Sequence, residues 1–257
     1  MNQKQKAAAF HALHVRGRPV VLFNIWDAGT ARAVAAAGAA ALATGSWSVA
    51  AAHGWDDGEQ VPLEFVLHNI RRITAAVDLP LTVDLEGGYG TTPAAVGETI
   101  AAALAAGAIG CNLEDTAPVT RSLRSAEDQA SRLVRARQAA DDTGIAFFID
   151  ARTDLFLLAP KEQHDVALAD AALERARRYV DAGADGFFVP GLIDAALIGR
   201  IAEGSPLPVN VMAAPGLPPL RVLQESGVAR VSHGPGPYRM LMQVLTSAAR
   251  KEYEQQG

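Results

Sequence analysis

Four stretches of the chain follow one plan, in which an alanine-rich helical segment closes at a glycine and an apolar strand begins directly after it. They read "AAGAAALATG", "AAGAIGCNLED", "DAGADGFFVPG" and "ESGVARVSHGP". Glycine is common just past the end of a helix, because the left-handed backbone conformation found there carries little steric penalty for it. The recurrence predicts a repeated strand–helix unit and so restricts the chain to α/β folds.

Eight short apolar runs alternate with longer segments whose apolar residues are three and four positions apart, such as "PLEFVLHNIRRITAAV". We interpret the runs as strands over 20–27, 41–45, 79–86, 110–115, 146–153, 186–191, 208–213 and 230–235. Eight strand–helix units in 257 residues are typical of a (β/α)8 TIM barrel, and we expect residues 1–257 to form one such domain. A doubly wound sheet would normally have fewer strands and a Gly-x-Gly-x-x-Gly loop after the first, where none stands.

Composition excludes several classes of function. The chain is 49% hydrophobic, which allows a large core, and its net charge of −5 comes with scattered basic residues. We therefore expect neither nucleic acid nor a membrane surface as a partner. The N-terminus lacks the apolar core of a signal peptide and no stretch reaches ~20 apolar residues, so we expect a cytoplasmic protein. Its only cysteine, Cys111, lies in an apolar run and is expected to be a small core residue.

Acidic residues end two neighbouring strands of the expected barrel. Asp84 and Glu86 are two positions apart in "LPLTVDLEGGYG" and should share one face, Glu114 ends the next strand, and Asp57 lies in the long loop after the second strand. Arg152 ends the fifth strand. Because chemistry in this fold is located where strands end, the acids predict a site for a hard cation, Mg²⁺ or alternatively Mn²⁺. In the alternative interpretation these are ordinary ion pairs, for example Arg152 with Asp150 or Asp154.

The motifs "ATGSWSVAAAHGWDDG", "VDLEGGYG", "CNLEDT", "DARTD" and "VNVMAAPG", in this order, resemble the isocitrate lyase/phosphoenolpyruvate mutase superfamily. The resemblance covers nearly the whole chain. It implies a (β/α)8 barrel whose last helix is swapped between subunits, giving a homodimer or homotetramer. It also implies Mg²⁺ and chemistry on 2-oxo or enol acids, with cleavage or formation of a C–C or P–C bond beside the oxo carbon.

Particular residues receive roles from this resemblance. Asp84 matches the direct metal ligand, and Asp57, Glu86 and Glu114 match the outer carboxylates that hold the metal's waters. Arg152 matches the arginine that binds the substrate's oxygens. The residues expected to contact the substrate at other points are Gly45, Ser46, Trp47 and Asn210. Ser46 could instead be a helix N-cap, and Trp47 could be a core residue.

The loop after Glu114 departs from the superfamily. It reads "EDTAPVTRSLRSAED" and contains neither cysteine nor histidine, so the proton donor of isocitrate and methylisocitrate lyases is missing. "PVTRSLR" resembles the loop of phosphonate enzymes, yet Val119 and Arg121 replace the lysine and asparagine tied to the phosphoryl group. The identity of any general acid or base within residues 117–128 stays open.

Three functions follow as hypotheses. The first is a Mg²⁺-dependent lyase that cleaves a C–C bond of a 2-oxo or 2-hydroxy dicarboxylate, and that is not a true isocitrate lyase. The second is a phosphoenolpyruvate mutase or phosphonopyruvate hydrolase, and the third a non-catalytic 2-oxo-acid binder. Pyruvate, oxaloacetate and 2-oxoglutarate should bind, the dicarboxylates more tightly if Arg121 or Arg124 closes over the second carboxylate.

The last helical segment, "PYRMLMQVLTSAARKEYEQQ", has an apolar face formed by Leu241, Val244, Leu245 and Ala248. A monomer would leave such a face uncovered, so we expect it to contact a second subunit. His233, just before this segment, is expected to be structural.

Overall fold

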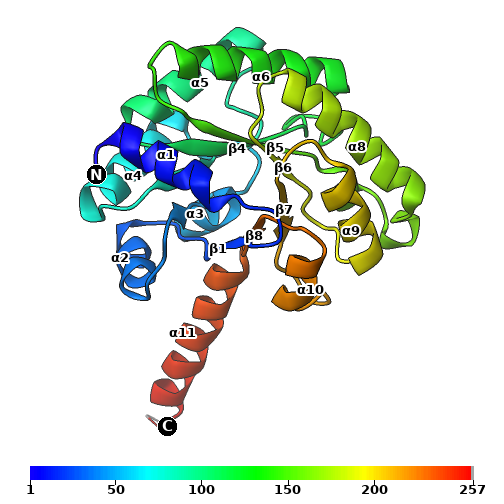
Figure 1. Ribbon diagram of the computed structural model, residues 1–257. Helices are drawn as coiled ribbons and strands as arrows, with labels where there is room; N and C mark the ends of the chain where they lie inside the picture. Colours follow the sequence, from blue (N-terminus) through cyan, green and yellow to red (C-terminus); the bar gives the residue numbers. More distant parts are fainter. Residues whose placement is uncertain (256–257) are drawn as a thin grey trace.

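The strands form within all eight predicted runs. The computed structural model describes residues 1–255 (Figure 1). Its strands are β1 (Val20–Leu22), β2 (Leu42–Ala43), β3 (Leu81–Asp84), β4 (Gly110–Glu114), β5 (Phe148–Arg152), β6 (Gly186–Phe188), β7 (Val209–Met212) and β8 (Arg230–Ser232). Each is shorter than its apolar run, because the ends of the runs belong to the loops at the two ends of the sheet.

All eight strands are parallel and pair in the order β1-β8-β7-β6-β5-β4-β3-β2. β1 and β2 are the two ends of this order, and a parallel bridge between Ile25 and Thr44 joins the segments that follow them. The sheet is therefore nearly closed, and the predicted (β/α)8 barrel is confirmed.

Helices surround the barrel (Figure 1). The outer ones are α2 (Ala28–Ala36), α4 (Leu63–Ala76), α5 (Pro93–Ala105), α6 (Ala126–Asp141), α8 (Val166–Asp181), α9 (Ala195–Gly204) and α10 (Leu220–Glu225). Short helices α3 (Ser46–Ala52) and α7 (Leu155–Leu158) and the 3-10 helix η1 (Lys161–Gln163) lie in loops that follow strands. The predicted glycine endings are confirmed, since Gly38, Gly107, Gly183 and Gly227 have φ between 82° and 105°.

An additional helix, α1 (Gln3–Leu13), closes the end of the barrel where the strands begin. Its Phe10 is fully buried against Leu22 and Phe148, and the Phe10 and Phe148 rings meet edge to face at 5.4 Å between centroids. His14, which follows the helix, stacks on Phe148 at 4.0 Å. This end of the barrel is filled by aromatic side chains.

Most of the remaining core is apolar, and Cys111 is fully buried in it, as predicted. Among residues 1–255, none of the helices is both long and apolar enough to cross a bilayer.

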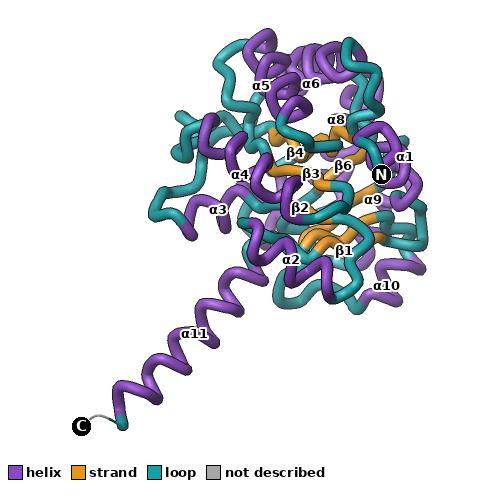
Figure 2. Tube along the Cα trace, turned by 90° about the vertical axis from the view of Figure 1, so that its left-hand side faces the viewer, coloured by secondary structure: helices purple, strands orange, loops and turns teal. Residues whose placement is uncertain are grey.

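Helix α11 (Gly236–Glu254) projects away from the barrel (Figures 1 and 2). Pro237 is its only buried residue, and Leu241, Val244 and Leu245 are exposed by 42%, 59% and 59%. An apolar face left in water on this scale is consistent with the predicted contact to another subunit, and subunit exchange stays a prediction.

Candidate active site

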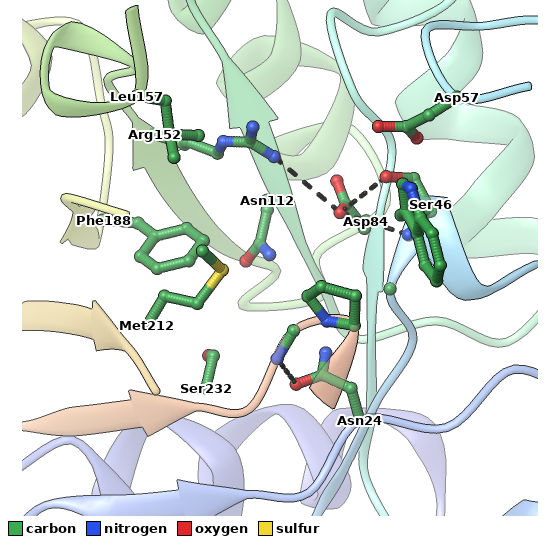
Figure 3. A pocket seen from close by; sticks show the side chains of 14 residues that line it. Asn24, Ser46, Asp57, Asp84, Asn112, Arg152, Leu157, Phe188, Met212 and Ser232 are labelled. Atoms are coloured by element: carbon green, nitrogen blue, oxygen red, sulfur yellow. Dashed lines mark hydrogen bonds and ion pairs between the residues drawn. The ribbon is translucent and has the colours of Figure 1, made fainter. Parts of the chain in front are cut away.

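A pocket of about 150 Å³ opens at the end of the barrel where the strands finish (Figure 3). One side carries the charged groups and the other is largely apolar. The residues that line it are Asn24, Gly45, Ser46, Trp47, Asp57, Asp84, Asn112, Arg152, Leu157, Phe188, Met212, Ser232, Gly234 and Pro235. This volume suits a small acid rather than a nucleotide.

Asp84 ends β3 and is the centre of the charged side. Its Oδ2 accepts hydrogen bonds from the backbone N–H of Ser46 at 3.2 Å and from the Ser46 hydroxyl at 3.0 Å. Ser46 is the first residue of α3, so the alternative that it caps this helix is wrong, because Gly45 holds the N-cap position. The two donors that we expected to face a substrate carboxylate are thus turned toward Asp84 in this structure.

Glu86 is placed differently from the prediction. The prediction had Asp84 and Glu86 leave one face of a strand, but β3 ends at Asp84, and Glu86 has a left-handed backbone with φ of 51°. Glu86 is buried, and its Oε2 accepts the backbone N–H groups of Gly58 at 2.8 Å and Glu59 at 2.6 Å. Glu86 therefore holds the loop that carries Asp57, and it does not line the pocket itself.

The loop that carries Asp57 depends on Gly58. Its φ is +98°, and a Cβ there would lie 2.7 Å from Nη1 of Arg121, so no other residue fits without a shift. Arg121 is exposed and rests on Gly58 beside Asp57, outside the pocket lining. The segment 117–128 and the Asp57 loop thus meet at the pocket mouth.

Arg152 ends β5 and is surrounded by carboxylates. Its Nε and Nη2 donate to Asp154 at 2.6 and 3.1 Å, its Nη1 lies 2.8 Å from Glu114 Oε2, and Asp84 Oδ2 lies 4.0 Å from the same nitrogen. The suggested pairing with Asp154 is therefore present, whereas Asp150 pairs elsewhere. A guanidinium has five N–H donors, so two remain for the oxygens of a ligand.

Acids outnumber bases at this mouth, and the pKa values reflect it. Burial, together with the charges of Asp57 and Asp84, raises the pKa of Glu86 to about 7. Desolvation and the nearby Asp84 raise the pKa of Asp57 as well. Burial is the larger cause of both pKa shifts, and the neighbouring like charges add to it.

The remaining predicted residues fall into two groups. Trp47 lines the pocket and is only partly buried, so it is not the core residue of the alternative interpretation. The Tyr238 ring lies 5.8 Å from the Trp47 ring, and the Arg239 guanidinium lies over the Trp47 ring at 4.5 Å. Asn210 is buried below the pocket, where its Nδ2 donates to Asp150 at 2.8 Å. Glu114 is behind Arg152 and does not line the pocket.

Sequence reasoning missed the neutral side of the pocket. Asn24 and Ser232 lie at or just beyond strand ends and Asn112 lies within β4, and the fold itself was the one signal that could have selected them. Phe188 and Met212 look like core residues in the sequence, and they line the pocket because they end β6 and β7. His233 does not line the pocket and lies against Phe23, as expected of a structural residue.

The donor set fits a partly hydrated cation. Among residues 1–255, no three His, Cys, Asp or Glu side chains are close enough together to enclose a metal ion by themselves. Asp84 and Asp57 nevertheless line one pocket, and a divalent cation between them would relieve their repulsion. Mg²⁺ is often held by one or two carboxylates while water and substrate oxygens complete its shell.

Solved structures share this fold. One of a candidate phosphonomutase from Burkholderia cenocepacia has a TM-score of 0.96 and 54% sequence identity, over 98% of this chain and 100% of that chain. A phosphonopyruvate hydrolase solved with oxalate and Mg²⁺ has a TM-score of 0.85 at 21% identity, covering 100% of this chain and 89% of that one, which shows the fold alone.

Sequence relatives agree with these structures. An uncharacterized protein of Mycobacterium tuberculosis is 36% identical over 94% of this chain and 88% of its own length. The 2-methylisocitrate lyase of Escherichia coli is 31% identical over 81% of this chain and 70% of its own length. The model of the phosphoenolpyruvate phosphomutase family matches residues 10–252. The chain therefore belongs to the phosphoenolpyruvate phosphomutase family, within the isocitrate lyase/phosphoenolpyruvate mutase superfamily.

Proposed function

We propose that this protein is a Mg²⁺-dependent lyase that binds a 2-oxo acid through its carboxylate and 2-oxygen and cleaves, or in reverse forms, the adjacent C–C bond. The observation that carries the proposal is the surplus of acid in the pocket, where Asp84 and Asp57 face Arg152 and Ser46 within one small cavity. A surplus of this kind suits a site that binds a cation and an anion together.

In the proposed site Asp84 would be the direct ligand of Mg²⁺ and Asp57 would hold its waters, whereas Glu86 and Glu114, which do not line the pocket, would act through the Asp57 loop and through Arg152. The bound ion would stabilise negative charge on the 2-oxygen as the adjacent bond breaks. Arg152 would bind substrate oxygens with its two unused N–H groups, and Asp154 and Glu114 would fix the plane of the guanidinium. Ser46, Gly45 and Trp47 would form the wall against the substrate carboxylate.

Two kinds of relative support a C–C bond as the target. The 2-methylisocitrate lyase and an oxaloacetate decarboxylase of Bradyrhizobium, 30% identical over 66% of this chain and 58% of its own length, are named for C–C chemistry. The loop over residues 117–128 has no cysteine or histidine, so true isocitrate lyase activity is not proposed.

A phosphonate enzyme is the second candidate, because the family model and the structure from Burkholderia cenocepacia are both described by phosphoryl chemistry. The side chain at the family's lysine position argues against it. Val119 is 93% exposed there and cannot bind a phosphoryl group as a lysine would.

The test is a panel of oxaloacetate, 2-methylisocitrate, dimethylmalate and phosphonopyruvate, each assayed with Mg²⁺ and with a chelator. We expect turnover of a C–C substrate that stops when Mg²⁺ is removed. Turnover of phosphonopyruvate alone would favour the second candidate. Tight binding of 2-oxo acids without turnover of any member would favour a non-catalytic binder and contradict the lyase.

We also propose that the protein assembles as a homodimer or homotetramer through the exposed face of α11, with Leu241, Val244 and Leu245 covered by the partner. Sedimentation of the protein at micromolar concentration should give a mass of at least two chains. A monomer under these conditions would contradict the assembly and leave the proposed chemistry untouched.

A further inference from the structure

The amide of Asn112 has a defined orientation. Arg230 Nη2 donates to Asn112 Oδ1 at 3.3 Å, and because arginine can only donate hydrogen bonds, the oxygen of the amide must face Arg230. The NH2 group is thereby turned the other way. Asn112 lines the pocket and is drawn there between Phe188 and Asp84 (Figure 3), and its Nδ2 donates to no residue that the structure describes.

The other two asparagines nearby each donate a hydrogen bond from Nδ2 within the protein. Asn24 Nδ2 donates to the Thr44 carbonyl at 2.9 Å, and Asn24 Oδ1 accepts the Gly234 N–H at 2.8 Å. Asn210 Nδ2 is used by Asp150. Asn112 is therefore the one of these three asparagines whose Nδ2 donates to no residue that the structure describes.

Arg230 is itself held rigidly below the pocket. It is fully buried, its Nη1 lies 3.2 Å from Asp150 Oδ2, and its Nε donates to the Ser232 hydroxyl at 3.0 Å. Asp150 fits beside β6 because residue 186 is glycine, where a Cβ would lie 2.6 Å from Asp150 Oδ1. A fully buried ion pair contributes little net stability, because the desolvation of both charges offsets most of their attraction. A role of the Arg230–Asp150 pair other than stabilising the fold would therefore explain its presence.

We propose that Asn112 contacts the substrate, donating a hydrogen bond from Nδ2 to an oxygen of the bound acid, and that the Arg230–Asp150 pair is the positioning device that turns this donor into the pocket. The inference rests on the proposed function, since it assigns Asn112 to the same ligand. It also defines the ligand class at this point of the pocket. The ligand must place a hydrogen-bond acceptor, such as a carboxylate or carbonyl oxygen, beside Asn112 at the bottom of the pocket, between β3 and β4.

Oxalate is a suitable probe, because all its polar atoms are acceptors. Calorimetric titration of oxalate at fixed Mg²⁺ should show Asn112→Ala binding about 10- to 100-fold more weakly than the parent, the range for a hydrogen bond to a charged group. Thr82→Val is the matched control, since Thr82 is a buried neighbour on β3 whose hydroxyl has no partner within residues 1–255, and it should bind as the parent does. Equal affinity of the parent and Asn112→Ala would overturn the inference.

The positioning role needs a separate measurement. Removing both charges, Arg230→Met with Asp150→Met, avoids leaving one charge buried alone, and thermal unfolding checks that the variant is folded. We expect this pair of changes to weaken oxalate binding about 3- to 10-fold when Asn112 is present, and not in the Asn112→Ala background. Equal losses in both backgrounds would show that the pair acts on the fold and not through Asn112.

The two proposals fail in different ways. If the parent protein binds neither oxalate nor any 2-oxo acid with Mg²⁺, the proposed function fails and this inference fails with it. If the parent binds oxalate and Asn112→Ala binds it equally well, only the inference fails.

Discussion

The two ends of this barrel solve the same structural problem in opposite ways. Where the strands begin, α1 packs Phe10 against Leu22 of β1 and Phe148 of β5 in an aromatic and aliphatic cluster. Where the strands finish, Asp84, Glu114 and Asp154 surround Arg152, Asp57 lies in the same lining, and the opening remains a pocket. One end is complete without a ligand, and the other holds more negative charge than its own residues balance.

In this comparison, folding stability is assigned to the closed end of the barrel and ligand binding to the open end. Aromatic side chains buried at the closed end contribute to folding whatever the pocket holds, whereas the open end keeps its acids at the expense of mutual repulsion. Changes at the closed end should therefore alter the free energy of unfolding, and changes at the open end should alter ligand affinity. Four variants test this division.

The largest expected effect is at the open end. Asp84→Ala should abolish Mg²⁺-dependent binding of oxalate and 2-oxo acids in calorimetry, because it removes the proposed direct ligand of the ion. The variant should remain folded, and the apo protein should unfold at an equal or higher temperature, since one of the crowded charges is gone. Asp56→Ala, an exposed neighbour of Asp57, is the control and should bind normally. Unchanged Mg²⁺ affinity in Asp84→Ala would mean that the strand-end acids are structural.

At the closed end, Phe10→Ala should lower the free energy of unfolding by about 3–5 kcal/mol, the range for removing a buried aromatic ring. Phe10 is fully buried, whereas Phe23 is 37% exposed, so Phe23→Ala should lose clearly less in the same chemical denaturation. Oxalate affinity of the folded fraction should not change in Phe10→Ala. A weakened pocket in a variant of normal stability would break the comparison between the two ends.

Arg152→Ala should weaken binding of pyruvate, oxaloacetate and 2-oxoglutarate by about 10- to 100-fold at fixed Mg²⁺, because charge-assisted hydrogen bonds to the acid are lost. Arg152→Lys keeps the charge but loses the planar group, and should recover only part of the affinity. Acetate, which has no 2-oxygen to chelate the ion, should bind poorly to all forms. Arg221, 87% exposed on α10, gives the control Arg221→Ala. The same affinity for acetate and pyruvate in the parent would contradict a chelated oxo acid.

The smallest effect concerns pH at the closed end. Burial, followed by the charge of Arg230, lowers the pKa of His14 to about 3. Below pH 6.5 the unfolded chain then binds a proton that the folded protein does not, so stability should fall as the pH falls. Between pH 7.5 and pH 5.5 the loss from this residue should be about 1–1.5 kcal/mol.

His14→Phe keeps an aromatic ring on Phe148 and should remove this part of the pH dependence, measured by chemical denaturation with a chelator present. His68, which is exposed on α4, supplies the control, and His68→Ala should follow the parent curve. A parent and a His14→Phe variant with identical pH dependence would show that His14 titrates normally in the folded state.

Strand and helix locations were predictable from the sequence because each strand–helix unit repeats the same local physics, with apolar periodicity and a glycine at the helix end. The charged side of the pocket was predictable too, since Asp84 and Arg152 stand out at the ends of apolar runs. Phe188 and Met212 were not, because an apolar residue that ends a strand looks the same whether it enters the core or lines a pocket.

Two further features depend on three-dimensional geometry that cannot be derived from the spacing of residues in the sequence. The predicted alternation of Asp84 and Glu86 failed because β3 ends between them and the backbone turns left-handed at Glu86. Asn112 attracts no attention in "GCNLEDT", and its orientation is set by Arg230, which lies 118 positions away in the chain. Partners this distant meet only after the barrel closes.

Helix α11 joins the pocket to the outside of the molecule. At its base Tyr238 and Arg239 rest on Trp47 in the pocket wall, and the 19-residue helix, about 28 Å long, projects into solvent. Whatever covers Leu241, Val244 and Leu245 therefore acts on a helix whose base contacts Trp47, a residue of the pocket lining. If covering that face changes how Trp47 sits, reciprocity requires that filling the pocket change the affinity for the covering partner by the same factor.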